Sequence, residues 1–200
     1  TAFTVIINFC NRTTHIYINT NEEYVNLVKE QLPEVSADNI LAEPIHRNTA
    51  PSMAWANHRI SMMNPDACVI TTPSDQAIFN EEAFRKNVLE GLAFVAENNH
   101  FLTMGVKPTR PEPGYGYIQM GDVYSDNIYQ VQSFTEKPER DFAKVFVESG
   151  EFYWNTGLFL SNVSYLRECF CKILPPVLRD YDKQYPEFSV ETENAYMKES

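Results

Sequence analysis

Apolar residues recur along the chain at two alternating spacings, one typical of amphipathic helices and the other typical of strands. Helical spacing, ended by polar caps, glycine or proline, predicts helices over residues 22–32, 49–63, 80–96, 140–149 and 161–174. Alternating or continuous apolar runs predict strands over residues 15–19, 39–42, 67–71, 102–107, 117–124, 128–136 and 153–160. Residues 1–10 fit either pattern, and the spacing of their apolar positions favours a helix.

The predicted elements alternate between strand and helix, which implies a mostly parallel sheet flanked by helices. The sequence therefore predicts an α/β protein with a Rossmann-like fold. Residues 117–124 and 128–136 are joined by a short polar turn and predict an antiparallel hairpin insertion, so the sheet is mixed. The continuous apolar run 67–71 is typical of a strand buried on both faces. Ligands bind such sheets beyond the carboxyl ends of the strands.

The composition is that of an ordinary soluble globular protein, with 44% hydrophobic and 22% charged residues. A length of 200 residues fits one domain or most of one. We expect a piece of a longer protein, because the chain starts at Thr1 without a methionine and stops in polar sequence. No apolar stretch reaches the roughly 20 residues of a membrane helix, and no signal peptide opens the chain. These features favour a cytoplasmic protein without a membrane partner.

The formal net charge of −11 argues against a nucleic-acid partner, which would require a basic stripe. A phosphate ligand needs positive charge gathered locally, from a metal ion and from Arg47, Lys107, Arg110 and Lys137. The closest cysteine pair, Cys169 and Cys171, lies in a helix-like apolar segment. This favours free buried thiols in a reducing compartment over a zinc site. The four histidines lack metal-ligand spacing and are interpreted as surface or structural residues.

Two short runs carry the most informative chemistry. Residues 134–138 read F-T-E-K-P and place a carboxylate beside an ammonium group at the end of a predicted strand. Residues 154–157 read W-N-T-G and bring an amide, a hydroxyl and a glycine. A carboxylate and an amide can hold sugar hydroxyls, and a lysine can neutralise a phosphate. Each run alone is also typical of a solvated strand end or a turn. Together they suggest a sugar-phosphate pocket.

Further polar runs lie in loops near the predicted strand ends. Residues 43–51 offer donors and acceptors that suit a guanine edge, or that cap the next helix. Asp75 follows the most hydrophobic strand and suits Mg²⁺ held together with ligand phosphates, or forms a simple turn. Gly105 and the glycines of residues 112–117 permit close approach of the backbone to a ligand, or a tight turn.

Five motifs then occur in a specific order: E-P-x-x-R-N-T-A-P, P-S-D, E-x-G-Y-G-Y, F-x-E-K-P and W-N-T-G. This set resembles the mannose-1-phosphate guanylyltransferases, or GDP-mannose pyrophosphorylases, of the nucleotidyl-sugar pyrophosphorylase family. The resemblance runs from about residue 19 to residue 174. It implies a fold of the nucleotide-diphospho-sugar transferase type. It also implies that a mannose-1-phosphate oxygen attacks the α-phosphorus of GTP, which gives GDP-mannose and pyrophosphate.

The resemblance assigns one group of residues to the nucleotide. Glu43, Asn48 and Thr49 would lie near the guanine, and Arg47 would lie close to the nucleotide. Asp75 would bind the cofactor Mg²⁺ together with the nucleotide phosphates and so take part in catalysis.

A second group is assigned to the sugar phosphate. Gly116 and Tyr117 would line the sugar side, while Glu136 and Asn155 would hold mannose hydroxyls. Lys137 would grip the sugar phosphate and is the second catalytic residue. Positioning and charge neutralisation would supply most of the catalysis.

The chain also departs from the family pattern. The glycine-rich loop G-G-x-G-x-R-L-x-P and the second metal-binding aspartate, in a W-x-D-x-G context, are not found in the 200 residues. Gln76 replaces a histidine after P-S-D, and Pro113 replaces a threonine before G-Y-G-Y. Residues 1–200 are therefore expected to form a partial nucleotidyltransferase domain that alone turns over little or nothing.

Two alternatives stay open at this point. One is a pyrophosphorylase that uses another base or sugar. The other is a non-catalytic regulatory subunit that senses sugar nucleotides. The sequence leaves the oligomeric state open, a homodimer included, and it does not reveal whether an isomerase domain follows downstream.

Overall fold

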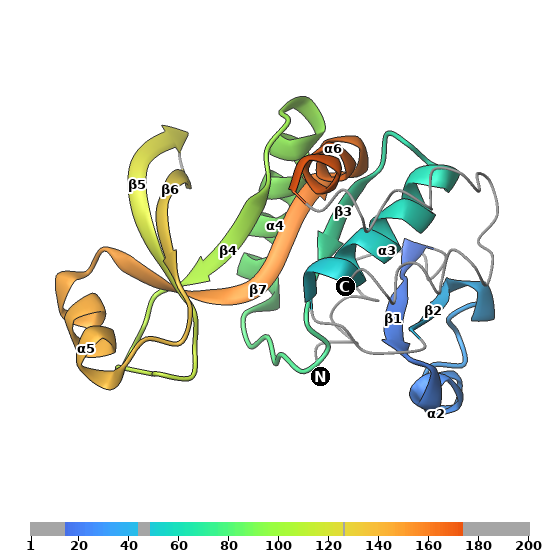
Figure 1. Cartoon of the computed structure of the whole chain (residues 1–200), viewed down its shortest axis with the longest axis horizontal. Helices are drawn as coiled ribbons and strands as arrows, with labels where there is room; N and C mark the ends of the chain where they lie inside the picture. The colour runs from blue at the N-terminus through green and yellow to red at the C-terminus, as the bar shows by residue number, and fades with distance from the viewer. Residues whose placement is uncertain (1–14, 44–48, 126, 174–200) are drawn as a thin grey trace. The chain divides into compact units, whose positions relative to one another are not determined.

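The structure, a computed structural model, describes residues 15–43, 49–125 and 127–173 (Figure 1). The chain divides into two compact units. Unit 2 comprises Leu102–Phe159, and unit 1 comprises Thr1–Phe101 together with Leu160–Ser200.

Unit 1 contains two parallel strands, helices and a further strand. Its elements are β1 (Ile18–Asn21), η2 (Glu22–Tyr24), α2 (Val25–Gln31), η3 (Ala37–Asn39), β2 (Ile40–Glu43), α3 (Thr49–Met63), β3 (Cys68–Thr71), α4 (Glu81–Glu97) and α6 (Val163–Ile173). β1 pairs with β2 in parallel, with Ile18 opposite Ile40. The side chain of Asn57 in α3 donates to the Val163 carbonyl at 3.1 Å. Val88, Val95 and Val163 are fully buried and form part of the core.

Unit 2 consists of strands and one helix. Its elements are β4 (Leu102–Val106), β5 (Tyr117–Ser125), β6 (Ile128–Thr135), α5 (Arg140–Ser149) and β7 (Phe152–Asn162), the last of which continues past Phe159. The five-stranded sheet has the order β3-β7-β5-β6, with β4 also paired to β7. β5 runs antiparallel to both β6 and β7. β6 and β7 therefore run in the same direction on the two sides of β5, with α5 as their crossover.

The expected mostly parallel sheet is thus found only in part. The predicted hairpin is confirmed as part of the larger sheet, where β6 is the end strand of the order and β5 joins it to β7. Strands joined by a tight turn must run antiparallel, and β7 adds to the free edge of the hairpin strand β5. The expectation that residues 67–71 are buried on both faces is wrong, because all four residues of β3 are only half-buried.

Several predicted boundaries are confirmed by local geometry. Helices over 49–63 and 140–149 begin and end as predicted. Asn80 caps α4 by accepting from the Ala83 N–H at 3.0 Å. Gly150 ends α5 with φ 75°, in the left-handed region that glycine adopts without cost.

Other boundaries differ. The first described strand starts at Ile18, and the helix after it opens with a 3₁₀ turn. The last helix, predicted from residue 161, begins at Val163 and is capped by Asn162, whose Oδ1 accepts from the Tyr165 N–H at 2.7 Å. Cys171 is exposed, so the expectation that both close-spaced thiols are buried is wrong for this residue. The helix expected in residues 1–10 lies outside the described residues. No helix of the described ranges combines the length and apolar character needed to cross a membrane.

Aromatic packing fixes the inner layer of unit 2. Tyr117, at the start of β5, is fully buried, and its ring centroid lies 5.4 Å from that of Phe146 in α5. The Phe146 ring also stacks on Phe152 of β7 at 4.0 Å. Ala143 is buried on the same helix. The helix therefore holds the beginnings of β5 and β7 in one packed layer.

Gly105 serves backbone packing in β4. A Cβ at this position would lie 2.9 Å from the Cβ of Tyr153 in β7, closer than real Cβ atoms come. The absence of a side chain at Gly105 therefore lets β4 approach the neighbouring strand β7 closely.

We predict that Gly105→Ala lowers the free energy of unfolding by about 1–3 kcal/mol, because a Cβ rooted in the backbone cannot move aside. The measurement is chemical denaturation. Gly114→Ala is the matched control, since its nearest neighbour is the flexible Glu112 Oε1 at 3.3 Å, and it should change stability by only about 0.5 kcal/mol. Equal stability of the two variants would contradict the packing role of Gly105.

Candidate functional site

Three of the sequence motifs converge on the start of β5. The register pairs Tyr117 with Thr135 of β6 on one side and with Trp154 of β7 on the other. Just before the strand, the Lys137 N–H donates to the Tyr115 carbonyl at 3.2 Å. On the opposite side, the Asn155 N–H donates to the carbonyl of the intervening glycine at 2.8 Å. The G-Y-G-Y, F-x-E-K-P and W-N-T-G segments therefore lie side by side.

Two of the polar side chains lie close to the backbone of Gly116. A Cβ built there would lie 2.6 Å from Glu136 Oε2 and 3.3 Å from Asn155 Cβ. A side chain at this position would have to displace the flexible Glu136 carboxylate and would press on Asn155 Cβ, so glycine lets both groups lie against the backbone. The Glu136 side chain is 69% exposed, so its oxygens are open to a ligand. An acceptor and an amide thus face the same stretch of backbone.

Lys137 has the unusual backbone of the site. Its φ is 45°, the only positive value of a non-glycine residue in the described ranges. The side chain is 66% exposed, and its Nζ lies 3.9 Å from Glu136 Oε1. A left-handed conformation costs a residue with a Cβ roughly 1–2 kcal/mol, and such strain concentrates at functional sites. The turn brings an ammonium group and a carboxylate to the same exposed edge.

The Asn155 side chain is held by its own strand and by a neighbouring one. Its Oδ1 accepts from the Gly157 N–H at 3.0 Å and from the Thr103 hydroxyl at 3.3 Å. Gly157 has φ 70°, which returns its N–H toward the amide and requires a glycine. The order asparagine, threonine, glycine in W-N-T-G therefore has a local geometric reason.

Tyr117 occupies a different environment from the other sugar-side candidates. Its hydroxyl accepts from the Glu112 N–H at 2.9 Å, and its side chain is wholly buried. It thereby ties down the loop that carries the glycines of G-Y-G-Y. Any contact of this residue with a ligand is left to its backbone.

The nucleotide-side candidates belong to unit 1. Glu43 is the last residue of β2, and Thr49 is the exposed first residue of α3. Asp75 lies exposed in the turn after β3. Arg47 and Asn48 lie outside the described residues. The backbone thus brings Glu43 and Thr49 to the two ends of one connecting segment.

Comparison with known proteins decides the family. A family model described as nucleotidyl transferase matches residues 3–187. The chain belongs to the nucleotidyl transferase family.

Curated relatives and a solved structure agree with this assignment. The mannose-1-phosphate guanylyltransferase of Klebsiella pneumoniae is 38% identical over 164 residues, which covers 79% of this chain and 34% of that protein. Mannose-1-phosphate guanylyltransferase RfbM of Salmonella typhimurium is 40% identical over 153 residues, covering 74% and 32%. The chain therefore spans about a third of the length of these relatives. They confirm the resemblance on which the sequence interpretation depends.

The nucleotidyl transferase fold is shown independently by structural similarity. The crystal structure of mannose-1-phosphate geranyltransferase from Thermus thermophilus superimposes with a TM-score of 0.85 at 21% identity. The match covers 98% of this chain and 56% of that chain. The α/β nucleotidyltransferase-like class expected from the sequence is thereby confirmed.

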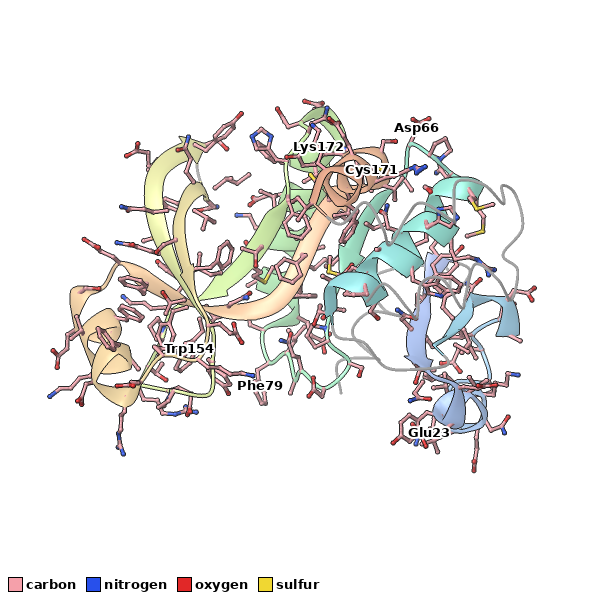
Figure 2. All side chains as sticks on the ribbon, in the orientation of Figure 1. Glu23, Asp66, Phe79, Trp154, Cys171 and Lys172 are labelled. Carbon is pink, nitrogen blue, oxygen red and sulfur yellow. The ribbon has the colours of Figure 1, made fainter. Side chains whose placement is uncertain are left out.

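Arg110 in this nucleotidyl transferase site differs from the sequence expectation, and Thr103 is not predicted from the sequence at all. Arg110 is a candidate for phosphate charge by sequence, but its Nη2 lies 3.2 Å from Glu112 Oε2 and its guanidinium stands 5.4 Å from the Trp154 ring centroid. Its charge is thus already partnered. The Trp154 side chain is labelled in Figure 2. Thr103 belongs to none of the five motifs. Thr103 could have been identified only by knowing that β4 pairs with β7, and no local sequence pattern predicts that pairing.

We predict that Lys137→Asn raises the free energy of unfolding by up to about 1 kcal/mol, because asparagine tolerates the left-handed region better than lysine. Thermal or urea unfolding measures this. Lys144→Asn, at an exposed position within α5, is the control and should lose a few tenths of a kcal/mol in helix propensity, about 0.5 at most. If both variants lost the same stability, backbone strain at Lys137 would be ruled out.

Proposed function

We propose that this chain is the nucleotidyltransferase part of an enzyme that forms GDP-mannose and pyrophosphate from GTP and mannose-1-phosphate. The observation that carries the proposal is the meeting of Glu136, Lys137 and Asn155 around Gly116. The names of the curated relatives supply the substrate class. Because the chain spans about a third of those relatives, the activity is proposed for the full-length protein.

The sugar phosphate would bind in unit 2. Glu136 has only acceptor oxygens at neutral pH and would accept from mannose hydroxyls, while Asn155 adds an amide. Lys137 would neutralise the phosphate as a compact point charge. Its Nζ and the Glu136 carboxylate stand 3.9 Å apart, which suits a ligand that carries a phosphate next to hydroxyls. Gly116 would let the ligand approach the backbone, and buried Tyr117 would hold the loop in place.

The nucleotide would bind through unit 1 residues. Glu43, Asn48 and Thr49 would contact the guanine, where a carboxylate suits the ring N–H and amine. Arg47 would lie near the phosphates. This part of the proposal is supported by the motif and by the position of Glu43 and Thr49 at the ends of one segment.

Asp75 fits the requirements of a Mg²⁺ ligand. It is an exposed carboxylate in a loop, and the described residues contain no group of three metal-binding side chains. Magnesium is commonly held by one or two carboxylates plus substrate phosphates, so Asp75 would supply one protein ligand beside the second aspartate that the family resemblance implies. Bound Mg²⁺ would neutralise phosphate charge during the transfer. Asp75 would orient the nucleotide through that shared ion.

The reaction itself needs little covalent participation of the protein. A phosphate oxygen of mannose-1-phosphate forms a bond to the α-phosphorus of GTP, and the bond to the β-phosphate oxygen breaks to release pyrophosphate. Lys137 would hold the attacking group and lower the repulsion between the two anions. The rate would therefore depend mainly on positioning and electrostatics.

The finer fold expectations belong to the same proposal. We infer a mostly parallel, Rossmann-like sheet for the complete domain, of which residues 1–200 are a part. Support comes from the parallel pair β1–β2 and from the common direction of β6 and β7.

The decisive experiment assays the full-length protein in reverse. Supplied with GDP-mannose, pyrophosphate and Mg²⁺, it should form GTP, while UDP-glucose and dTDP-glucose should give no UTP or dTTP. Turnover of a control substrate instead would reassign the base or sugar. Binding of GDP-mannose without turnover would favour a regulatory subunit.

A second prediction concerns Lys137. In the full-length enzyme, Lys137→Ala should raise the KM for mannose-1-phosphate by about tenfold or more, while the KM for GTP changes little. Hydrogen bonds to charged groups contribute about 1.5–3 kcal/mol, which sets this scale. Lys144→Ala is the control, since that exposed lysine is paired with Glu148 on α5. Equal increases for both substrates would remove Lys137 from the sugar phosphate.

A further inference from the structure

The two ends of the Asn155 amide are distinguished by the structure. The Gly157 backbone N–H can only donate, so the atom facing it at 3.0 Å must be the carbonyl oxygen Oδ1. An inverted amide would place its NH₂ group against this donor. The left-handed turn at Gly157, with φ 70°, makes that contact a fixed property of the chain.

Thr103 completes the arrangement from β4. Its hydroxyl lies 3.3 Å from the same Oδ1 and therefore donates to it. The side chain is half-buried on a strand that pairs with β7. Oδ1 thus receives two donors, one from its own strand and one from the neighbouring strand.

The remaining end of the amide has a defined character. No hydrogen bond among the described residues uses Asn155 Nδ2 as a donor to another protein group. Its two N–H groups are left for a ligand. Across Gly116 lies the Glu136 carboxylate, which only accepts when ionised. The site thereby presents a donor end and an acceptor end on one stretch of backbone.

We propose that Thr103 is a positioning residue that, together with the Gly157 N–H, holds Asn155 as a pure donor toward the sugar. The sugar hydroxyl that binds Asn155 then accepts a hydrogen bond from the amide. The sugar hydroxyl that binds Glu136 donates a hydrogen bond to the carboxylate. This deepens the proposed function and rests on it for the identity of the ligand. A hydroxyl-bearing sugar phosphate satisfies both ends, whereas an analogue without the hydroxyl facing Asn155 leaves the amide unpaired.

The test compares Thr103→Val, which keeps the shape and removes the donor, with Thr103→Ser, which keeps the donor. In the full-length enzyme, Thr103→Val should raise the KM for mannose-1-phosphate about three- to tenfold, the scale of one hydrogen bond, with the KM for GTP unchanged. Thr103→Ser should stay within about twofold of wild type on that scale. Ser133→Ala is the control, because it removes a strand hydroxyl that donates to Gln119 instead, at 2.9 Å.

Asn155→Asp tests the donor character directly. It keeps the acceptor for Thr103 and Gly157 but replaces the NH₂ group by an oxygen, which cannot donate. Its KM for mannose-1-phosphate should rise at least as much as that of Asn155→Ala. An aspartate variant that retains the wild-type KM would overturn the proposal, as would a Thr103→Ser variant as weak as Thr103→Val.

A spectroscopic readout separates this inference from the proposed function. With ¹⁵N-labelled asparagine, the side-chain NH₂ signal of Asn155 is the one lost in Asn155→Asp. It should shift in Thr103→Val and stay in place in Thr103→Ser. If wild type makes no GDP-mannose but this shift occurs, the activity is wrong and the positioning role stands. An unmoved signal in Thr103→Val would overturn the positioning role whatever the activity.

Discussion

The sugar side of the site depends on one strand being paired along both edges. Tyr117 begins β5 and pairs with Thr135 on one side and with Trp154 on the other. The residues next to these three positions are therefore brought close together. Burial of the Tyr117 ring against Phe146 fixes where that strand starts. A shift of one residue would reverse the faces of the strand and remove the glycine from between its polar neighbours. The register is thus a condition for the chemistry, not only for the fold.

Backbone conformations that few residues adopt are concentrated at this point. Lys137, at φ 45°, lies just beyond the end of β6, and Gly157, at φ 70°, lies within β7, and these two strands flank β5. The glycine takes its turn freely, whereas the lysine does so at a cost that the surrounding pairing must offset. Keeping a lysine there is consistent with selection for its ammonium group over local stability.

Local patterns are sufficient to predict most elements but not their assembly. Caps and stops such as Asn80 and Gly150 act over three or four residues, and their helices are predicted correctly. The helix predicted from residue 161 begins two residues later, after Asn162, because serine and asparagine both suit a cap and only the length of β7 decides between them.

The candidate site could be predicted as a set of motifs but not as a geometry. The parallel-sheet rule expects ligands at carboxyl ends of strands, and Glu136 does follow β6. Gly116, however, precedes β5, and Asn155 lies within β7. They meet through antiparallel pairing between distant segments. The contact of Thr103 with Asn155 spans 52 positions and has no local signature.

The chain contains two tryptophans, and each compact unit holds one of them. Trp55 is buried in α3 of unit 1. The ring of Trp154 in unit 2, labelled in Figure 2, lies 5.4 Å from the Arg110 guanidinium and makes a T-shaped contact with the Tyr115 ring. The emission of an indole depends on its surroundings, and these differ between Trp55, which is excluded from solvent, and Trp154, which has a cation nearby. The protein thus carries a separate intrinsic fluorophore in each unit, and the one in unit 2 adjoins Asn155. Binding at the sugar side can therefore be followed by the fluorescence of Trp154, without an added label.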